Sequence, residues 1–248
     1  MTAARAEATN DPSSTCKSGT GQAVISACTT LIDARALSGT DLAEAFYNRG
    51  NAYYGVRSFA RAVQDFDQAI SLKSDYAEAY CRRGYTKLFL GQPSQALLDT
   101  NQALKLKPDF AEAYNNRGVI YEAMGRYDEA IRDYDQAIKL IPNYADAYNN
   151  RGSTYDDMGQ PARALAELNQ AIALRPNSAD YFYNRALVYA RMKQFASAIR
   201  DYDQAVGLRP EYAEALYNRG LAKKANGDVS GGEADIAAAR KISPDIGR

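Results

Sequence analysis

Apolar and aromatic residues recur along this chain with a period of 34 residues, starting at Ala43. Within each period they fall into two blocks with spacings of three and four residues, the pattern of a helix with one buried face. A glycine separates the blocks in four copies and a proline follows the second block in most, and both residues are typical of helix C-termini. The pattern predicts pairs of antiparallel helices stacked on copies of themselves.

The copy at 111–144 defines the expected boundaries most clearly, with helices over 111–124 and 128–140. Gly125 lies between the two helices and Pro142 follows the second. The same punctuation predicts six repeats, at 43–76, 77–110, 111–144, 145–178, 179–212 and 213–246.

Two segments precede the repeats. Residues 1–20 are rich in Ala, Thr, Ser, Gly, Asp and Pro and are predicted to be disordered. Residues 21–42 are predicted to hold one amphipathic helix, over 22–36, and the loop that follows it. This helix would cover the open side of the first repeat, as caps of repeat proteins do.

Counted from Ala111 as position 1, the repeat carries an aromatic residue at 4, a small residue at 8, tyrosine at 11, alanine at 20, an aromatic residue at 24, alanine at 27 and proline at 32. Over 43–246 this pattern resembles the tetratricopeptide repeat (TPR) family. The resemblance implies an all-α fold, a right-handed α-solenoid of six stacked antiparallel helix pairs with an N-terminal capping helix. It also implies a concave groove lined by the first helices, through positions 2, 5, 6, 9, 12 and 13.

Position 7 departs from the family pattern, because every copy has arginine where leucine is usual. An acid follows each arginine after 16 residues, and a charge inside a repeat needs a partner. We therefore predict an ion pair between the two helices of each repeat. The alternative is a pair of surface charges inherited by duplication. The predicted pairs are Arg49 with Asp65, Arg83 with Asp99, Arg117 with Asp133, Arg151 with Glu167, Arg185 with Asp201, and Arg219 with Asp235.

Position 6 is the best candidate for contact with a ligand. Related repeat proteins use an asparagine ladder there to bind an extended peptide, since an amide offers one acceptor and two donors. The alternative is that asparagine is simply common at this position. The residues are Asn48, Arg82, Asn116, Asn150, Asn184 and Asn218.

Other groove positions supply apolar and charged candidates. Tyrosines offer apolar area with a polar tip, although some could pack between repeats instead. The tyrosines assigned to the peptide-binding groove are Tyr47, Tyr54, Tyr85, Tyr183 and Tyr217, with Phe89 as a further aromatic candidate. Acids at the centre of the predicted groove favour a peptide with a basic central segment, unless they form an ordinary solvated face. The acids are Glu112, Glu122, Asp146, Asp156 and Asp157.

Composition excludes several classes of function. The chain has 30 basic and 30 acidic residues, so it lacks the basic excess that nucleic acids and anionic membranes reward. It has no histidine, which removes the commonest general base and metal ligand. Its carboxylates and tyrosines repeat with the period, which marks them as architecture, so we predict no catalytic residue, metal or cofactor. No apolar run is long enough to span a membrane.

The three cysteines, Cys16, Cys28 and Cys81, fit no zinc or redox spacing. From the residues alone, a Cys16–Cys28 disulfide and three free thiols both remain open. A cysteine pair ahead of such repeats resembles bacterial exported TPR proteins with Asn-Arg-Gly repeats, which favours the disulfide and a periplasmic or exported location over a cytoplasmic one. Ala4-Arg5-Ala6 resembles the end of a signal-peptide cleavage site, but no apolar segment precedes it.

Together these features predict a non-enzymatic scaffold that binds a peptide or partner protein in its groove. The alternative is a structural module that stacks end to end through its terminal repeats, giving a weak homo-oligomer.

Overall fold

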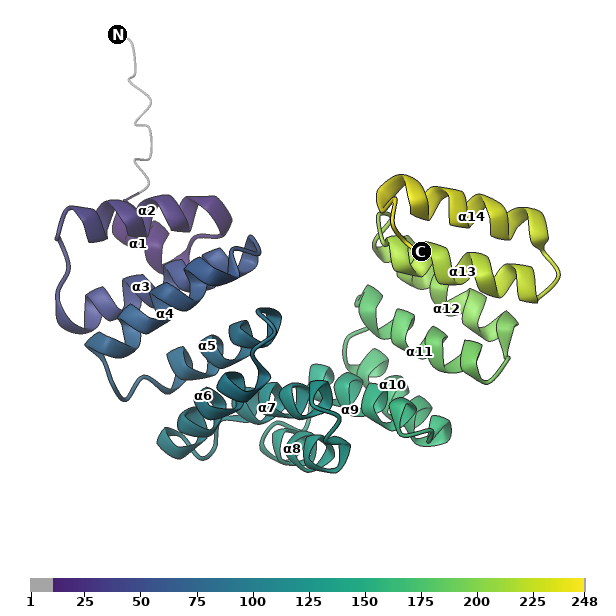
Figure 1. Ribbon diagram of the computed structural model, residues 1–248, viewed down its shortest axis with the longest axis horizontal. Helices are drawn as coiled ribbons and strands as arrows, with labels where there is room; N and C mark the ends of the chain where they lie inside the picture. Colours follow the sequence, from purple (N-terminus) through teal and green to yellow (C-terminus); the bar gives the residue numbers. More distant parts are fainter. Residues whose placement is uncertain (1–10, 248) are drawn as a thin grey trace, which may run out of the picture. The chain divides into compact units, whose positions relative to one another are not determined.

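The computed structural model describes residues 11–247, which hold 14 helices and no strand (Figure 1). The N-terminal helices are α1 (Pro12–Ser18) and α2 (Gly21–Asp33). The first helices of the predicted repeats are α3 (Gly39–Gly55), α5 (Ala77–Phe89), α7 (Ala111–Ala123), α9 (Ala145–Asp157), α11 (Ala179–Arg191) and α13 (Ala213–Ala225). The second helices are α4 (Phe59–Leu72), α6 (Pro93–Leu106), α8 (Tyr127–Leu140), α10 (Pro161–Leu174), α12 (Phe195–Leu208) and α14 (Val229–Ile242). The predicted all-α solenoid is confirmed.

The chain forms two compact units, Met1–Met124 and Gly125–Arg248. The division falls inside the predicted third repeat, between α7 and α8. In each unit, consecutive helices pack against one another along the chain, as α3 does on α4 and α13 on α14. The 34-residue boundaries themselves remain a prediction.

Small residues allow the two helices of a repeat to approach closely. A Cβ atom added at Gly152, at position 8, would lie 2.9 Å from Cγ of Leu168 on the facing helix. Alanines at position 20, such as Ala164 and Ala198, are fully buried. Turn glycines such as Gly125, with φ of 72°, adopt the left-handed backbone that ends the first helix.

The predicted disorder of residues 1–20 is wrong for the part that the structure describes. Residues 12–18 form α1, whose first turn is capped by the carboxylate of Asp11, which accepts from the backbone N–H groups of Ser13 and Ser14. Residues 1–10, including Ala4-Arg5-Ala6, lie outside the described part. The loop before the repeats also lies earlier in the chain than predicted, because α2 ends at Asp33 and α3 begins at Gly39.

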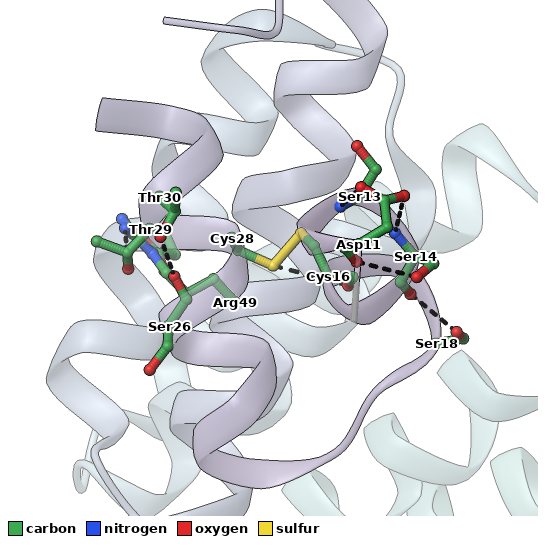
Figure 2. Close-up of a disulfide and its surroundings, with 11 residues drawn as sticks. Asp11, Ser13, Ser14, Cys16, Ser18, Ser26, Cys28, Thr29, Thr30 and Arg49 are labelled. Carbon is green, nitrogen blue, oxygen red and sulfur yellow. Dashed lines mark hydrogen bonds and ion pairs between the residues drawn. A yellow bond between two sulfur atoms is a disulfide. The ribbon is translucent and has the colours of Figure 1, made fainter. Parts of the chain in front are cut away.

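A disulfide between Cys16 and Cys28 joins α1 to α2, with an S–S distance of 2.09 Å (Figure 2). Both cysteines are buried in a small apolar core with Val24, Ala45 and Ala52. A helix of seven residues cannot persist alone in water, so the disulfide and this core supply what the local sequence lacks. Cys81 is the free thiol of the described residues, and burial raises its pKa to about 12.

Candidate functional site

The first helices form a continuous face in each unit. Helices α3, α5 and α7 contact one another in sequence in the first unit, and α9, α11 and α13 do so in the second. No such contact joins α4 to α6 or α10 to α12 in the part of the chain that the structure describes. Each unit therefore curves toward its first helices, which places the predicted groove positions on the inner side.

The predicted arginine–acid pairs are confirmed in five repeats. In the fifth repeat, Nε and Nη2 of Arg185 donate to the two carboxylate oxygens of Asp201, at 2.7 and 2.8 Å. The arginine also lies on the ring of Phe182, at 5.7 Å from its centroid. The other pairs are Arg49–Asp65, Arg83–Asp99, Arg151–Glu167 and Arg219–Asp235. Arg117 and Asp133 lie in different units, so that pair remains a prediction.

Each of these arginines makes a second contact that the sequence reasoning missed. Nη1 of Arg185 donates to Asn169 of the preceding repeat at 2.7 Å, and Nη1 of Arg219 donates to Asp203 at 2.8 Å. These partners lie 16 residues before the arginine, at position 25, which alternates between Asp and Asn. One guanidinium therefore joins three helices. The recurring Asp or Asn at position 25 is the sequence signal from which this contact could have been predicted. The equivalent contacts are Arg83–Asp67, Arg117–Asn101 and Arg151–Asp135.

The first arginine shows how α2 replaces a missing repeat. Nη1 of Arg49 donates to the hydroxyl of Thr29 on α2 at 3.0 Å (Figure 2). Helix α2 thus meets α3 in the place that a preceding second helix would take. This agrees with its predicted role as a cap.

The asparagines at position 6 bond to position 5 of the preceding repeat. Nδ2 of Asn184 donates to Oδ1 of Asn149 at 2.9 Å, and Nδ2 of Asn218 donates to the Tyr183 hydroxyl at 3.0 Å. In the first unit, Nδ2 of Asn116 approaches Sγ of Cys81 at 3.3 Å. These residues therefore hold neighbouring repeats in register, in addition to any role toward a ligand.

The position 6 residues differ in how much they present to solvent. Asn184 and Asn218 are half-buried, whereas Asn116 is buried, with 5% of its surface exposed. Asn48 lines two hollows together with Cys16 and Lys17 of α1, so α1 lies beside it. Asn150 is half-buried and accepts from Nδ2 of Asn149 at 3.2 Å. Arg82 is occupied by an ion pair with Glu112 at 2.9 Å.

Most of the predicted groove tyrosines pack within their unit. Tyr47 lies against Phe66 and Tyr76, with ring centroids 5.9 and 5.0 Å away. Tyr183 repeats this arrangement with Tyr202 and Tyr212, at 6.0 and 5.0 Å. Tyr54 and Tyr85 belong to a separate aromatic cluster described below. Gly247 lies so close to the Tyr217 ring that an added Cβ would be 2.3 Å from its hydroxyl, so the C-terminal segment partly covers Tyr217.

The central acids are largely neutralised within the chain. Asp156 and Asp157 both pair with Arg191, at 2.8 and 3.4 Å, beside a hollow of about 160 Å³ that Ser153, Asn184 and Leu187 also line. Burial raises the pKa of Asp156, and Arg191 opposes that shift.

Two further acids show the same behaviour. Asp146 pairs with Arg175 and accepts from the Tyr181 hydroxyl, and Glu112 pairs with Arg82. Glu122 is half-buried on α7. The groove face is therefore less acidic than the sequence suggests.

Among residues 11–247, no three cysteine, aspartate or glutamate side chains converge as ligands for a metal ion. No helix of this part is long and apolar enough to span a bilayer.

Comparison with known proteins shows the family. One tetratricopeptide repeat model matches residues 43–76 and 111–144, and a second matches residues 133–166. A third model, described as a TPR repeat, matches residues 89–125, 154–193 and 191–227. The chain belongs to the tetratricopeptide repeat family. Proteins of this family bind peptides or other proteins and are generally non-enzymatic scaffolds. The comparison with curated proteins finds no match.

Solved structures of similar fold include three repeat proteins. The chain is 26% identical to MamA, over 65% of this chain and 94% of that one, with a TM-score of 0.56. It is 22% identical to TTC0263, a thermophilic TPR protein of Thermus thermophilus, over 73% and 98%, with a TM-score of 0.68. It is 23% identical to YrrB, a TPR protein with an unusual peptide-binding site, over 73% and 93%, with a TM-score of 0.52. The last two likenesses concern the fold alone.

Proposed function

We propose that this protein is a non-enzymatic scaffold that binds an extended peptide or partner segment along its first helices, with Asn184 and Asn218 of the second unit as the main polar contacts. The observation that carries the proposal is the way these amides are held. One N–H of each is bonded to the preceding repeat, and no partner is found among the described residues for the carbonyl oxygen of either. A half-buried amide in a fixed orientation can pair with a peptide group at low entropic cost.

Hydrogen bonds alone cannot hold such a ligand. Each contributes about 0.5–1.5 kcal/mol net, while association costs about 4–15 kcal/mol in lost freedom. Side chains of the ligand must therefore enter neighbouring hollows. The hollow beside Asn184, lined by Ser153, Leu187 and Val188, offers such a place.

A ligand with a basic central segment would have to compete with cations of the chain for the acids of the groove. Asp156 and Asp157 are already paired with Arg191, and Asp146 with Arg175. A ligand lysine or arginine would have to displace these partners, so the proposal rests on backbone recognition and not on charge.

The test is capture of partners with wild-type protein and with the Asn184→Ala/Asn218→Ala double variant. We expect the variant to lose the specifically captured proteins, with an affinity at least tenfold weaker for any partner isolated, because two polar contacts are removed. Asn177→Ala is the matched control, since Asn177 is an exposed asparagine outside the first helices. An unchanged set of captured proteins, from a variant with a native circular dichroism spectrum, would contradict the proposal.

Self-association is a second proposal, and exposed apolar residues on the last repeat favour it. Leu221, Val229 and Ile242 are 45%, 52% and 43% exposed. If the chain stacks through this end, light scattering should show a mass that rises with protein concentration, and Val229→Lys should abolish the rise. A constant monomer mass up to high concentration would exclude stacking.

A further inference from the structure

Four aromatic rings gather on the first unit, at the C-terminal ends of α3 and α5 and at the start of α4. Phe59 and Phe89 stack with centroids 5.1 Å apart, and Tyr54 lies 5.5 Å from Phe59 and 5.6 Å from Phe89. Tyr85 closes the group, with its centroid 5.3 Å from that of Phe89. Burial raises the pKa of Tyr54 to about 12, with the neighbouring Tyr85 adding to the shift.

This aromatic cluster remains open to solvent. Phe89 is 45% exposed, and Val56, which precedes Arg57 in the chain, is 46% exposed. Tyr54, Gly55, Arg57, Phe59 and Phe89 line a hollow of about 320 Å³, the size of a pocket for a side chain with its flanking backbone. Apolar area left uncovered at a concave site is a mark of a binding surface.

Two arginines flank the cluster. Arg57 lines the hollow, and it also lines a second one with Phe59 and Arg61. Both arginines are exposed, and no carboxylate of residues 11–247 lies within ion-pair distance of either. The nearby acids Asp65 and Asp67 are bound to other arginines, Arg49 and Arg83. Arg61 lies over the ring of Tyr53, 5.7 Å from its centroid, but this contact leaves its charge without a counter-charge. The rim of the aromatic cluster therefore carries positive charge that no carboxylate in this part of the chain neutralises.

Arg57 also has an unfavourable backbone for its residue type. Its φ is +60°, in the left-handed region, at the repeat position that glycine occupies in four copies and Lys193, with φ of 58°, in the fifth repeat. A non-glycine residue there is strained, so Arg57→Gly removes the guanidinium without imposing a new backbone strain.

The cluster is absent from the other junctions between repeats. At no other junction do all four positions equivalent to Tyr54, Phe59, Tyr85 and Phe89 hold aromatic residues. Between the fourth and fifth repeats the same positions hold Asp156, Pro161, Leu187 and Arg191, and the site is filled by the Asp156–Arg191 ion pair. Architecture shared by the repeats therefore does not account for this cluster.

We propose that this aromatic cluster binds an acidic peptide segment of a partner protein, which inserts one large apolar side chain against Phe59 and Phe89 while its flanking carboxylates meet Arg57 and Arg61. The apolar hollow requires an apolar anchor, and the two arginines, which have no acidic partner among the described residues, select carboxylates beside it. This site is separate from Asn184 and Asn218 and does not rest on the function proposed for them.

The test uses the full chain and a capped pentapeptide, Glu-Glu-Trp-Glu-Glu. Because the protein has no tryptophan, the fluorescence of the peptide reports binding directly. We expect saturable binding that weakens with salt, and a loss of about tenfold in affinity on Phe89→Ala. Arg57→Gly should weaken binding about fivefold while the fold is retained, since glycine accepts the left-handed backbone.

Matched controls make each outcome decisive. Lys193→Gly makes the equivalent change at the other cationic turn with positive φ in a repeat, where φ is 58°, and should leave binding unchanged. Asn184→Ala/Asn218→Ala should also leave it unchanged, which separates this site from the groove. The proposal is overturned if Lys-Lys-Trp-Lys-Lys binds equally well or if Arg57→Gly and Phe89→Ala bind normally. It is also overturned if the chain forms a dimer that Phe89→Ala dissolves, because a second copy would then occupy the site.

Discussion

Replacing Asp201 with alanine is expected to lower the free energy of unfolding by about 3–5 kcal/mol. Asp201 is 6% exposed and accepts two hydrogen bonds from Arg185, so its loss leaves a largely buried guanidinium without its counter-charge. Asn169 would be the one remaining polar partner among the described contacts of Arg185. Denaturant unfolding followed by circular dichroism measures the change.

The double variant Arg185→Leu/Asp201→Leu should be less destabilised than Asp201→Ala, since leucine is usual at position 7 in the family and an apolar pair can replace a buried ion pair. Asp203→Ala is the control on the same helix. Asp203 pairs with Arg219 but its side chain is 50% exposed, so its loss should cost less than about 1 kcal/mol. Equal effects for Asp201→Ala and Asp203→Ala would contradict a special role for the buried pair.

Removing the disulfide is expected to release α1. The Cys16→Ser/Cys28→Ser variant lacks the bridge between two residues separated by 12 positions. We expect its loss to lower the free energy of unfolding of this N-terminal region by about 3 kcal/mol. Exchange of the backbone amides that follow Pro12 in α1 should then become fast, because so short a helix has no stability of its own. Helices of the second unit should exchange as before.

Thiol counting supports the same test. Denatured protein without reductant should show one free thiol, Cys81, and native protein should react slowly, since Cys81 is buried and its pKa is raised. Cys81→Ala is the control and should leave the exchange of α1 unchanged. Three free thiols, or unchanged protection of α1 in the serine variant, would contradict the tether.

Much of the fold could be predicted because the same pattern of helix signals occurs in six copies. Gly125 and Pro142 mark helix ends by backbone conformation, and the spacing from Arg185 to Asp201 joins two facing helices. Helix α1 could not be predicted in this way. Its residues Ser13, Ser14 and Thr15 are poor helix formers, and the helix depends on the disulfide and the core beneath Cys16 in addition to its Asp11 cap.

The candidate site was harder to predict, because its side chains form contacts between repeats. The hydrogen bond from Asn184 to Asn149 spans 35 residues. Neither the repeat pattern nor the residue type shows that the Asn184 amide nitrogen already has a partner in the preceding repeat. The acidity predicted for the groove is reduced for a similar reason, since Arg191, one repeat later, pairs with Asp156. Long-range ion pairs depend on the stacking of the repeats, which local spacing does not describe.

The disulfide also bears on the compartment. Disulfides persist in oxidising environments and are rare in reducing ones. The Cys16–Cys28 bridge therefore supports the prediction of a periplasmic or exported location, which remains a prediction.

Hydrogen–deuterium exchange of the chain with and without a captured partner peptide tests the central claim most directly. If the first helices hold the peptide, α11 and α13 should gain protection on binding, while the outer helices α10 and α12 stay unchanged. The Asn184→Ala/Asn218→Ala variant should lose this protection at the same peptide concentration. Protection confined to α10 and α12, or protection that persists in the double variant, would contradict peptide binding by the asparagines of the first helices.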